Sequence, residues 1–502
     1  MKTKKALYNI ISELTFEVVA LICGLILPKM VLEAYGSAYN GVIQTIIQFL
    51  SYISVLTLGV TGPTRVAVYR ALAKQDDQKL HGILKANELY MRKVGGVLVI
   101  YMVLLAFIYP YLVREEFGWW DVASLVLIIG TGDLVEYVFG CSSRTLLKAD
   151  QRTYIYTLLM ISSKIASTLI AALLVRKGFG IHAVRLAMVA CFATAPILTD
   201  IITKTKYHIN SSVKPDYSAL EQRGDAVAHS IVGIVEDSAP TFLLAVFTNP
   251  VTVSIYSVYD LILWNILKIQ KAFTSNLEGA FGEFWAKGEK DKFKEKLNTL
   301  EYLMFVFLLL IYTTTGSLLL PFMKLYTEDI TDANYILPWF AFLFTCCTAA
   351  YSLRTPYVLA VQAAGKYRET RNMATIEAVI NVSISLVGVC IWGLNGVVIG
   401  SLAAYLYRTF SFAHYAYNTM LNVPITQFIS RLIWLLASSV VIVAMQLFIV
   451  KCVLNVNSWL QWVMAGVICV GVAGAFTVVS SLLFYKQELR NSLRLVRVML
   501  SR

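Results

Sequence analysis

The sequence predicts an all-α, polytopic membrane protein, and three observations support that fold class. Apolar residues make up 58% of the 502 residues and charged residues only 15%, whereas soluble domains carry about 25% charged residues. The apolar residues gather in runs of about 20, the length that crosses a bilayer as a helix. Lysine and arginine are concentrated in alternate loops, as the positive-inside rule describes.

About fourteen apolar runs are long enough to be transmembrane helices. The first lies in MKTKKALYNIISELTFEVVALICGLIL, which has the basic start of a signal peptide. It lacks a small-residue cleavage site and its apolar part is too long, so we expect a retained helix. The predicted spans are centred near residues 17, 52, 101, 131, 165, 191, 238, 262, 311, 348, 382, 406, 441 and 472.

The distribution of basic residues predicts that both termini are cytoplasmic. The opposite loops hold few lysines and arginines, and the pair Arg176–Lys177 is the main exception. A nucleic-acid binder could carry the same net charge of +12, but here the basic residues lie between apolar runs, so the positive-inside rule explains them better and we expect no nucleic-acid partner. The basic clusters assigned to the cytoplasmic side lie at 2–5, 65–93, 144–152, 204–223, 268–296, 366–371 and 486–502.

An internal repeat divides the spans into two halves. AKQDDQKLHGILKANELYM (73–91) is similar to AKGEKDKFKEKLNTLEYLM (286–304), at an offset of 213 residues. GFGIHAVRLAMVA (178–190) is similar to GLNGVVIGSLAA (393–404), at an offset of 215 residues. Each copy holds six predicted spans, and an even number keeps the second copy in the orientation of the first. The pattern predicts two six-helix lobes related by an axis along the membrane normal, as in parallel-repeat transporters.

The repeat also predicts the domain organisation. We expect an N-terminal lobe at 1–210, a cytoplasmic linker at 211–225, a second lobe at 226–420, and two additional helices with a basic tail at 421–502. The charged segments 73–91 and 286–304 carry apolar residues at helical spacing. That spacing predicts amphipathic helices lying on the cytoplasmic membrane surface, with a solvated loop helix as the alternative.

Residue patterns for enzymes, metals and cofactors are absent from the sequence. The eight cysteines form no C-x-x-C and the five histidines do not pair with them, so we expect no metal, disulfide or cofactor. There is no G-x-S-x-G, Walker loop or H-E-x-x-H, which argues against an enzyme. An intramembrane glycosyltransferase or polymerase would not predict the six-span repeat.

Charged residues inside the predicted spans are the candidate functional residues. A charge at mid-bilayer costs ~2.5–3.5 kcal/mol on insertion scales, so it usually faces a cavity or a partner. Glu377 and Arg185 lie near span ends, where a structural role is favoured. The deeper acids are Glu13 and Glu17, Asp133 and Glu136, Glu236 and Asp237, and Asp260; the basic candidates are Arg65, Lys164 and Arg354.

The stretch VGIVEDSAPTFLLAVF (232–247) places Glu236 and Asp237 side by side in a predicted span. Adjacent helical positions point about 100° apart, so both carboxylates avoid lipid only beside a wide polar interior. Pro240 frees a backbone carbonyl and permits a bend, which predicts a hinge. We therefore favour a water-filled cavity, and a static ion pair with Lys164 or Arg354 is the alternative.

Several segments resemble one family of membrane transporters. They are YGSAYNGVIQTIIQFLSYISVLTLGVTGPTRVAVYRALAKQDDQKL (35–80), SIYSVYDLIL (254–263) and WGLNGVVIGSLAAYLYRTF (392–410). With the Tyr35–Gly36 pair and Asp237, they are similar to the polysaccharide transporter family of lipid-linked oligosaccharide flippases, which includes O-antigen flippases. That family belongs to the superfamily that also holds the multidrug and toxin extrusion (MATE) transporters. The resemblance covers most of residues 1–420.

The resemblance implies a fold, a function and a location. Such proteins have a MATE-like fold whose two lobes alternate access around a central cavity. They move undecaprenyl-diphosphate-linked repeat units across the bacterial plasma membrane for cell-surface polysaccharide (O-antigen or capsule) biosynthesis. The expected partners are this lipid-linked oligosaccharide and membrane lipids, with glycan polymerases and glycosyltransferases of the same pathway as candidates, and we expect a monomer. Arg65, Lys164 and Arg354 would hold the anionic diphosphate.

Acids outnumber bases within the spans, which an anion-binding cavity alone does not explain. Buried carboxylates can carry a proton or bind a cation, which would couple transport to an ion gradient. The candidates for this coupling or for lining the cavity are Glu17, Asp133, Glu136, Glu236, Asp237 and Asp260. The alternative is a MATE-like, cation-coupled multidrug antiporter. A non-transporting scaffold would give no reason for so many buried charges.

Overall fold

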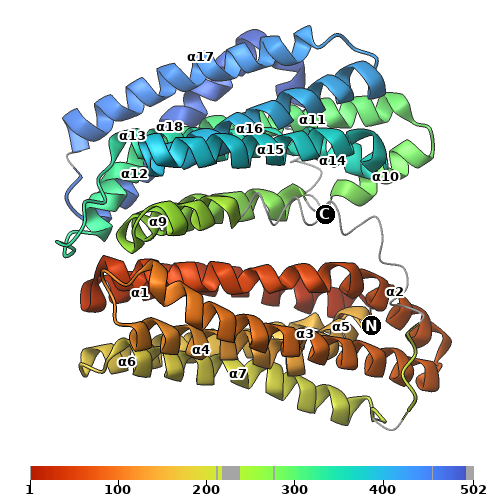
Figure 1. Ribbon diagram of the computed structural model, residues 1–502. Coiled ribbons are helices and arrows are strands. Elements are labelled where there is room, and N and C mark those ends of the chain that lie inside the picture. The colour runs from red at the N-terminus through yellow and green to blue at the C-terminus, as the bar shows by residue number, and fades with distance from the viewer. Residues whose placement is uncertain (1, 211–212, 218–237, 275–276, 455, 493–502) are drawn as a thin grey trace. The chain divides into compact units, whose positions relative to one another are not determined.

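A computed structural model describes residues 2–210, 213–217, 238–274, 277–454 and 456–492, and these are mostly helical (Figure 1). The chain forms two compact units, unit 1 (Met1–Val258) and unit 2 (Tyr259–Arg502). The boundary falls inside one helix, α9, rather than in the predicted linker. Most of that linker, and both Glu236 and Asp237, lie outside the described residues, so the predicted domain bounds stay a prediction.

Unit 1 is built around α1, which packs along α6, while α4 packs against α3 and α7. The short π turn η2 interrupts the helix that α4 and α5 would otherwise form. The elements are α1 (Lys2–Ser51), η1 (Tyr52–Thr57), α2 (Leu58–Lys74), α3 (Asp77–Leu112), α4 (Trp119–Val135), η2 (Glu136–Gly140), α5 (Cys141–Ala149), α6 (Thr153–Arg176) and α7 (Ile181–Lys206).

Helix α1 has one non-helical residue, Gly36, with φ = +86°. A side chain with a Cβ rarely adopts this region, so glycine is the residue that allows the bend. The neighbouring Tyr35 hydroxyl donates a hydrogen bond of 2.6 Å to the carbonyl of Phe179, in the turn between α6 and α7. The Tyr-Gly pair of the resemblance thus bends the first long helix and fixes the bend against its neighbour.

The chain segment before Tyr259 packs onto the second half of α1. Gln48 donates a hydrogen bond of 2.7 Å to the Ser238 hydroxyl, and the rings of Phe49 and Phe242 lie 5.7 Å apart. Asn40 donates one of 2.8 Å to the Ser254 hydroxyl. Pro240, the predicted hinge, is buried in this segment, in the helix Ser238–Phe247.

Unit 2 contains the helices that follow, and α15 and α16 form its most extensive helix pair. Its elements are α9 (Pro250–Thr274, shared with unit 1), α10 (Leu277–Ala286), α11 (Lys290–Phe307), η4 (Leu308–Tyr312), α12 (Thr313–Tyr326), α13 (Pro338–Leu353), α14 (Thr355–Ala363), α15 (Tyr367–Trp392), α16 (Leu394–Tyr415), η5 (Ala416–Met420), α17 (Thr426–Phe448), η6 (Ile449–Leu454) and α18 (Trp459–Phe484).

Ten helical segments of the described residues are long and apolar enough to cross a membrane. The predicted spans near residues 348 and 406 coincide with α13 and α16, which fall outside these ten. The prediction of an all-helical, multi-pass membrane protein is confirmed. The number of about fourteen spans and the two six-helix lobes stay predictions.

The two charged repeat segments are not separate surface helices, and that prediction is wrong. Each forms the beginning of a long helix, α3 in one case and α11 in the other. Leu80, Ile83 and Leu84 are buried against α2 and α5. Phe293 and Leu297 are buried in the largest core cluster of unit 2. The apolar stripes therefore cover protein rather than lipid.

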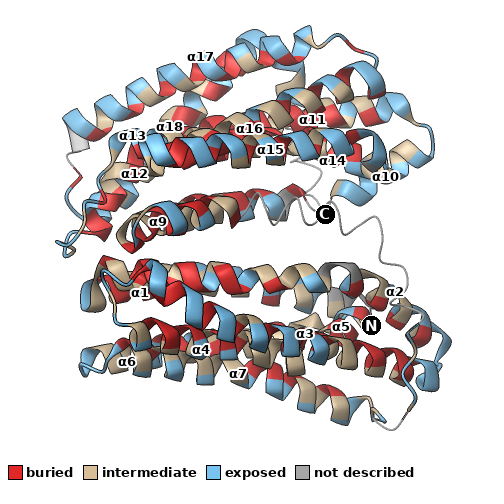
Figure 2. Ribbon diagram, in the orientation of Figure 1, coloured by how far each residue is buried: buried red, intermediate tan, exposed pale blue. Residues whose placement is uncertain are grey.

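Hydrogen bonds between buried side chains join the last two helices, α17 and α18, to the rest of unit 2. Gln446 of α17 is completely buried, accepts a hydrogen bond of 2.9 Å from Ser317 of α12 and donates one of 2.9 Å to the carbonyl of Cys469 in α18. Amide side chains are effective links between helices where no water competes. Other residues of α17 are exposed, as the pale blue turns of this helix in Figure 2 show, and Val440 is 70% exposed. Such exposed apolar residues suit contact with lipid.

Asp150 ties three parts of unit 1 together. Its carboxylate oxygens lie 2.9 Å from the Lys5 ammonium, 2.8 Å from the Arg152 guanidinium and 2.5 Å from the Tyr207 hydroxyl. Burial alone would raise the pKa of Asp150. The hydrogen bonds from Tyr207 and Lys5 and the charge of Arg152 outweigh burial, so the pKa lies below its usual value.

We expect Asp150→Asn to lower stability at neutral pH, by on the order of 1 kcal/mol because the site is partly exposed. A carboxylate with a lowered folded-state pKa stabilises fully above its unfolded pKa of about 4, and that contribution is lost as the pH falls through the folded-state value. Thermal unfolding of both proteins in detergent at pH 7 and about pH 3 measures the effect. The difference between them must shrink toward acid; a constant difference would contradict this role.

Candidate functional site

A cluster of cations and aromatic rings forms the first candidate site, and it lies in unit 2. Asp260, Trp264 and Lys271 share one face of α9, because their spacing follows the helical repeat. The Lys271 ammonium lies 4.8 Å from the ring centre of Trp264 and 5.1 Å from that of Tyr351 on α13. Lys271 is exposed, and within the described part of the chain no carboxylate pairs with it. The rings hold this ammonium in place by cation–π attraction.

Two arginines continue the cluster. The Arg354 guanidinium, after α13, lies 3.9 Å from the ring centre of Tyr351 and 5.0 Å from that of Tyr405 on α16. Arg354 and Arg408 both form ion pairs with the fully buried carboxylate of Glu377 on α15. We call the set Trp264, Lys271, Tyr351, Arg354, Glu377, Tyr405 and Arg408 the basic–aromatic cluster. Even with Asp260 counted, its cations exceed its carboxylates by one.

A pair of carboxylates forms the second candidate site, and it lies in unit 1. Asp133 lies in the last turn of α4 and Glu136 begins η2, and both are half-buried. The Glu136 carboxylate lies 3.2 Å from the Arg144 guanidinium and 3.3 Å from the Tyr156 hydroxyl. Asp133 receives no hydrogen bond from any described residue, so the pair keeps one carboxylate available.

The π turn makes room for this carboxylate pair. A Cβ on Gly140 would lie 2.5 Å from a Glu136 carboxylate oxygen, so a larger residue there would displace this carboxylate from its position. π turns inside helices are frequent at functional sites, since they redirect side chains at some cost in helix geometry. We call Asp133 and Glu136, with Arg144 and Tyr156, the carboxylate site.

The remaining sequence-predicted residues are distributed over both units. Arg65 on α2 and Lys164 on α6 are half-buried in unit 1, whereas Arg354 belongs to unit 2. Glu13 and Glu17 are both exposed on α1. Asp260 is half-buried beside the basic–aromatic cluster on α9.

Sequence reasoning missed Lys271 and the aromatic residues around it. Lys271 lies at the end of a span, where lysine is normally a topology signal, and was assigned to that class. The spacing of Asp260, Trp264 and Lys271 on one helical face was the available signal. Arg408 was missed as well, although its helix α16 packs against α13, which the predicted Arg354 follows.

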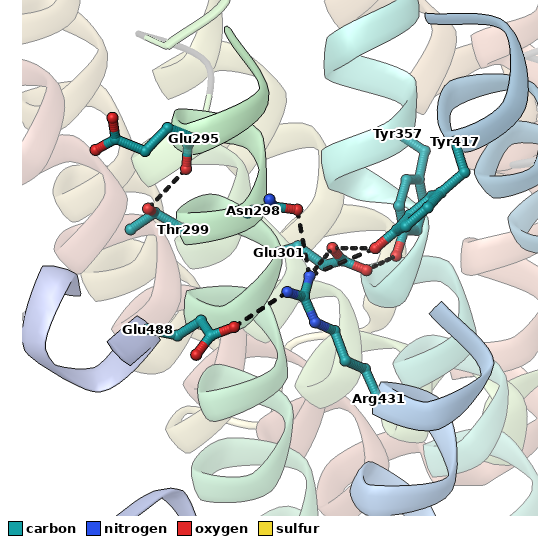
Figure 3. Close-up of polar contacts among 8 residues, drawn as sticks. All are labelled: Glu295, Asn298, Thr299, Glu301, Tyr357, Tyr417, Arg431 and Glu488. Atoms are coloured by element: carbon teal, nitrogen blue, oxygen red, sulfur yellow. Dashed lines mark hydrogen bonds and ion pairs between the residues drawn. The ribbon is translucent and has the colours of Figure 1, made fainter. Parts of the chain in front are cut away.

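Sequence reasoning also missed a buried polar network in unit 2, drawn in Figure 3. The Glu301 carboxylate of α11, only 1% exposed, accepts hydrogen bonds of 2.5 Å from Tyr357 and 2.7 Å from Tyr417. Arg431 of α17 pairs with the same carboxylate and also lies 3.3 Å from the Glu488 carboxylate. Every charge here has a partner, so the network stabilises the fold and leaves no group for a ligand.

Comparison with known proteins places the fold in a class of membrane transporters. No family model and no curated sequence matches the chain. Among solved structures, the lipid II flippase MurJ in an inward closed conformation is similar, with a TM-score of 0.69 and 12% identity over 95% of this chain and 98% of that one.

MATE transporters share the fold as well. An inward-facing MATE transporter of the MOP superfamily has a TM-score of 0.61 and 14% identity over 79% of this chain and 96% of that one. The Vibrio cholerae transporter VcmN has a TM-score of 0.52 and 16% identity, over 82% of this chain and 93% of that one. The protein therefore has the fold of the lipid II flippase and the MATE transporters.

Proposed function

We propose that the protein is a flippase that moves undecaprenyl-diphosphate-linked oligosaccharide repeat units across the bacterial plasma membrane by alternating access. The observation that carries the proposal is Lys271, an exposed cation fixed by two rings and lacking a carboxylate partner in the described structure. An unneutralised cation on a membrane-spanning helix suits an anionic headgroup. The fold and the sequence resemblance support the same reading.

Within the basic–aromatic cluster the side chains have different roles. Lys271 would donate hydrogen bonds directly to the diphosphate. Arg354 and Arg408 are engaged by Glu377, so they would add positive potential and fix the geometry rather than bind oxygen atoms themselves. Lys271 is thus added to Arg65 and Lys164 as a candidate for binding the diphosphate. Arg354 is now proposed to support this binding through its charge rather than to contact the diphosphate.

The carboxylate site would couple this movement to an ion. Asp133 is open to a proton or a monovalent cation, while Arg144 holds Glu136 in place. Glu17, Asp260, Glu236 and Asp237 stay candidates for the same purpose, and Pro240 for the hinge. The protein would act as a monomer with cytoplasmic termini, beside glycan polymerases and glycosyltransferases of its pathway.

A cation-coupled multidrug antiporter is the competing function, because MATE transporters share the fold. A cationic drug would meet Lys271 in the basic–aromatic cluster and be repelled by it. The charge of Lys271 therefore favours the flippase. Sensitivity of transport to cationic drugs distinguishes the flippase from the antiporter.

The test is the sidedness of the lipid-linked oligosaccharide in cells lacking this protein, read with a membrane-impermeant glycan probe. We expect accumulation on the cytoplasmic leaflet, relieved by the wild type. The Lys271→Gln protein should flip the lipid about tenfold more slowly, because one charge-assisted hydrogen bond to the diphosphate is lost. The Lys271→Arg protein should keep most of the activity.

Lys268→Gln is the matched control, since the exposed Lys268 lies one turn earlier on α9 and, among the described residues, its ammonium hydrogen-bonds only to Asn265. It should flip at the wild-type rate. Wild-type flipping by Lys271→Gln at equal protein levels would remove the role of the cluster. Normal sidedness without the protein would remove the flippase function for that glycan, and drug-efflux assays would follow.

A further inference from the structure

Arg185, in the second turn of α7, is a charged side chain that the proposed transport does not use. It is half-buried, and its Nε is covered and has no hydrogen-bond partner. Across the described ranges no residue forms an ion pair, a hydrogen bond or a ring contact with its guanidinium. Arg144, by contrast, has the Glu136 carboxylate at 3.2 Å.

Asp121 of α4, an acid that contacts the first turn of α7, is already engaged. His182, three residues before Arg185, has its Nε2 3.0 Å from the Asp121 carbonyl and 3.3 Å from a carboxylate oxygen of Asp121. The other carboxylate oxygen accepts a hydrogen bond of 2.7 Å from Tyr39. Asp121 is thus satisfied by α1 and α7 together, and Arg185 is left out of this group.

The helical face of α7 that carries Arg185 packs against α4. Val189 and Phe192 follow it on one helical face, and both lie against Gly132 of α4. Arg185 continues that face toward the N-terminal end of the helix. Its Nε is covered and unpaired, and the guanidinium offers its two terminal nitrogens as a planar pair of donors.

The position of Arg185 along the helix suits a headgroup. It is the fifth residue of α7, about 6 Å along the axis from the first. The cap residue Gly180 supplies no side-chain hydrogen bond to the first N–H groups of the helix, so this end also carries the positive part of the helix dipole. Both features favour an anion at the membrane surface.

We propose that Arg185 binds a lipid phosphate at this end of unit 1. Phosphate oxygens match the two terminal nitrogens of a guanidinium in a bidentate arrangement and would neutralise a charge that the protein leaves unpaired. The phosphate belongs either to a phospholipid of that leaflet or to the diphosphate of a translocated lipid. Binding at Arg185 goes beyond the proposed transport and does not depend on it.

Thermal unfolding of the full-length protein in detergent tests this site without any transport assay. The probes are phosphatidylglycerol and undecaprenyl diphosphate, each added to delipidated protein. The wild-type Tm should rise by about 2–5 °C with at least one probe, because a ligand that binds only the folded state stabilises it. Arg185→Leu should show no such rise.

The lipid-free proteins give an independent result. A guanidinium without partners opposes folding, so Arg185→Leu should melt at the same temperature as the wild type or higher. Arg185→Lys should keep part of the lipid-induced rise. Lys177→Gln, which removes an exposed cation just beyond α6, should keep all of it.

The outcomes separate the sources of phosphate and the alternatives. A rise with phosphatidylglycerol, alone or together with undecaprenyl diphosphate, identifies a leaflet phospholipid. A rise with undecaprenyl diphosphate alone identifies the diphosphate of a transported lipid, and each of these outcomes supports the site. An equal rise in Arg185→Leu, or no rise in the wild type with either probe, would overturn it. Loss of folded Arg185→Leu protein would show a structural arginine and would overturn it as well.

Discussion

Arg431→Leu is expected to cost about 3–5 kcal/mol of folding free energy, because it leaves the Glu301 carboxylate buried without its countercharge. Glu301 is 1% exposed, and Tyr357 and Tyr417 supply only neutral hydrogen bonds. The change should lower the Tm strongly and reduce the monodisperse fraction on size-exclusion chromatography. Both are measured on protein purified in the same detergent.

A second substitution separates a buried charge from lost packing. Adding Glu301→Leu to Arg431→Leu removes both charges and should recover most of the lost stability, since apolar replacements of buried ion pairs are often neutral. Arg490→Leu is the control, because Arg490 is exposed shortly after Glu488 and should change stability by less than about 0.5 kcal/mol. Wild-type stability of Arg431→Leu would contradict the importance of the network.

Gly396→Ala is expected to have a comparable effect through packing alone. Helices α15 and α16 join at Gly393 and approach so closely that a Cβ on Gly396 would lie 1.9 Å from the Gly388 carbonyl oxygen. Backbone cannot yield as a side chain can, so the helices must separate. Overpacking of this kind costs about 3 kcal/mol. The Tm and the yield of folded protein measure it.

The geometry also predicts a graded series. A Cβ on Gly388 would lie 2.7 Å from the Gly396 carbonyl oxygen, so Gly388→Ala should cost less than Gly396→Ala. Gly471 of α18 has no neighbour within 4 Å of its Cβ position. Gly471→Ala should therefore be neutral or stabilising by up to about 1 kcal/mol, through helix propensity. Equal effects at all three positions would rule out close helix contact as the cause.

The all-helical membrane fold was predictable because length and apolarity of a segment are read directly from its residues. What the apolar face of a helix packs against could not be predicted from the sequence. Leu80 and Phe293 lie on faces whose spacing is the same whether they meet lipid or another helix. Only the tertiary structure distinguishes the two, which is why the surface-helix prediction failed for both repeat segments.

In the candidate site, too, some residues could be predicted from the sequence and others could not. Arg354 was found because a charge inside a span is costly and therefore conspicuous. Its partner Glu377 lies on another helix, and no spacing rule connects residues of α15 with the end of α13. Lys271 stayed hidden for the opposite reason, since lysine at the end of a span is ordinary and only its two aromatic neighbours make it unusual.

The ion pair and hydrogen bonds of α17 determine how far the chain can be shortened. A protein cut after residue 425 would keep both repeat copies, and by sequence alone it would pass for a minimal transporter. It would, however, lose Arg431 and Gln446, leaving Glu301 without a cation and Ser317 without its acceptor. The helices after residue 425 lie outside the sequence repeat, yet two buried polar groups of the second copy bond to them, so we expect the shortened protein to be unstable.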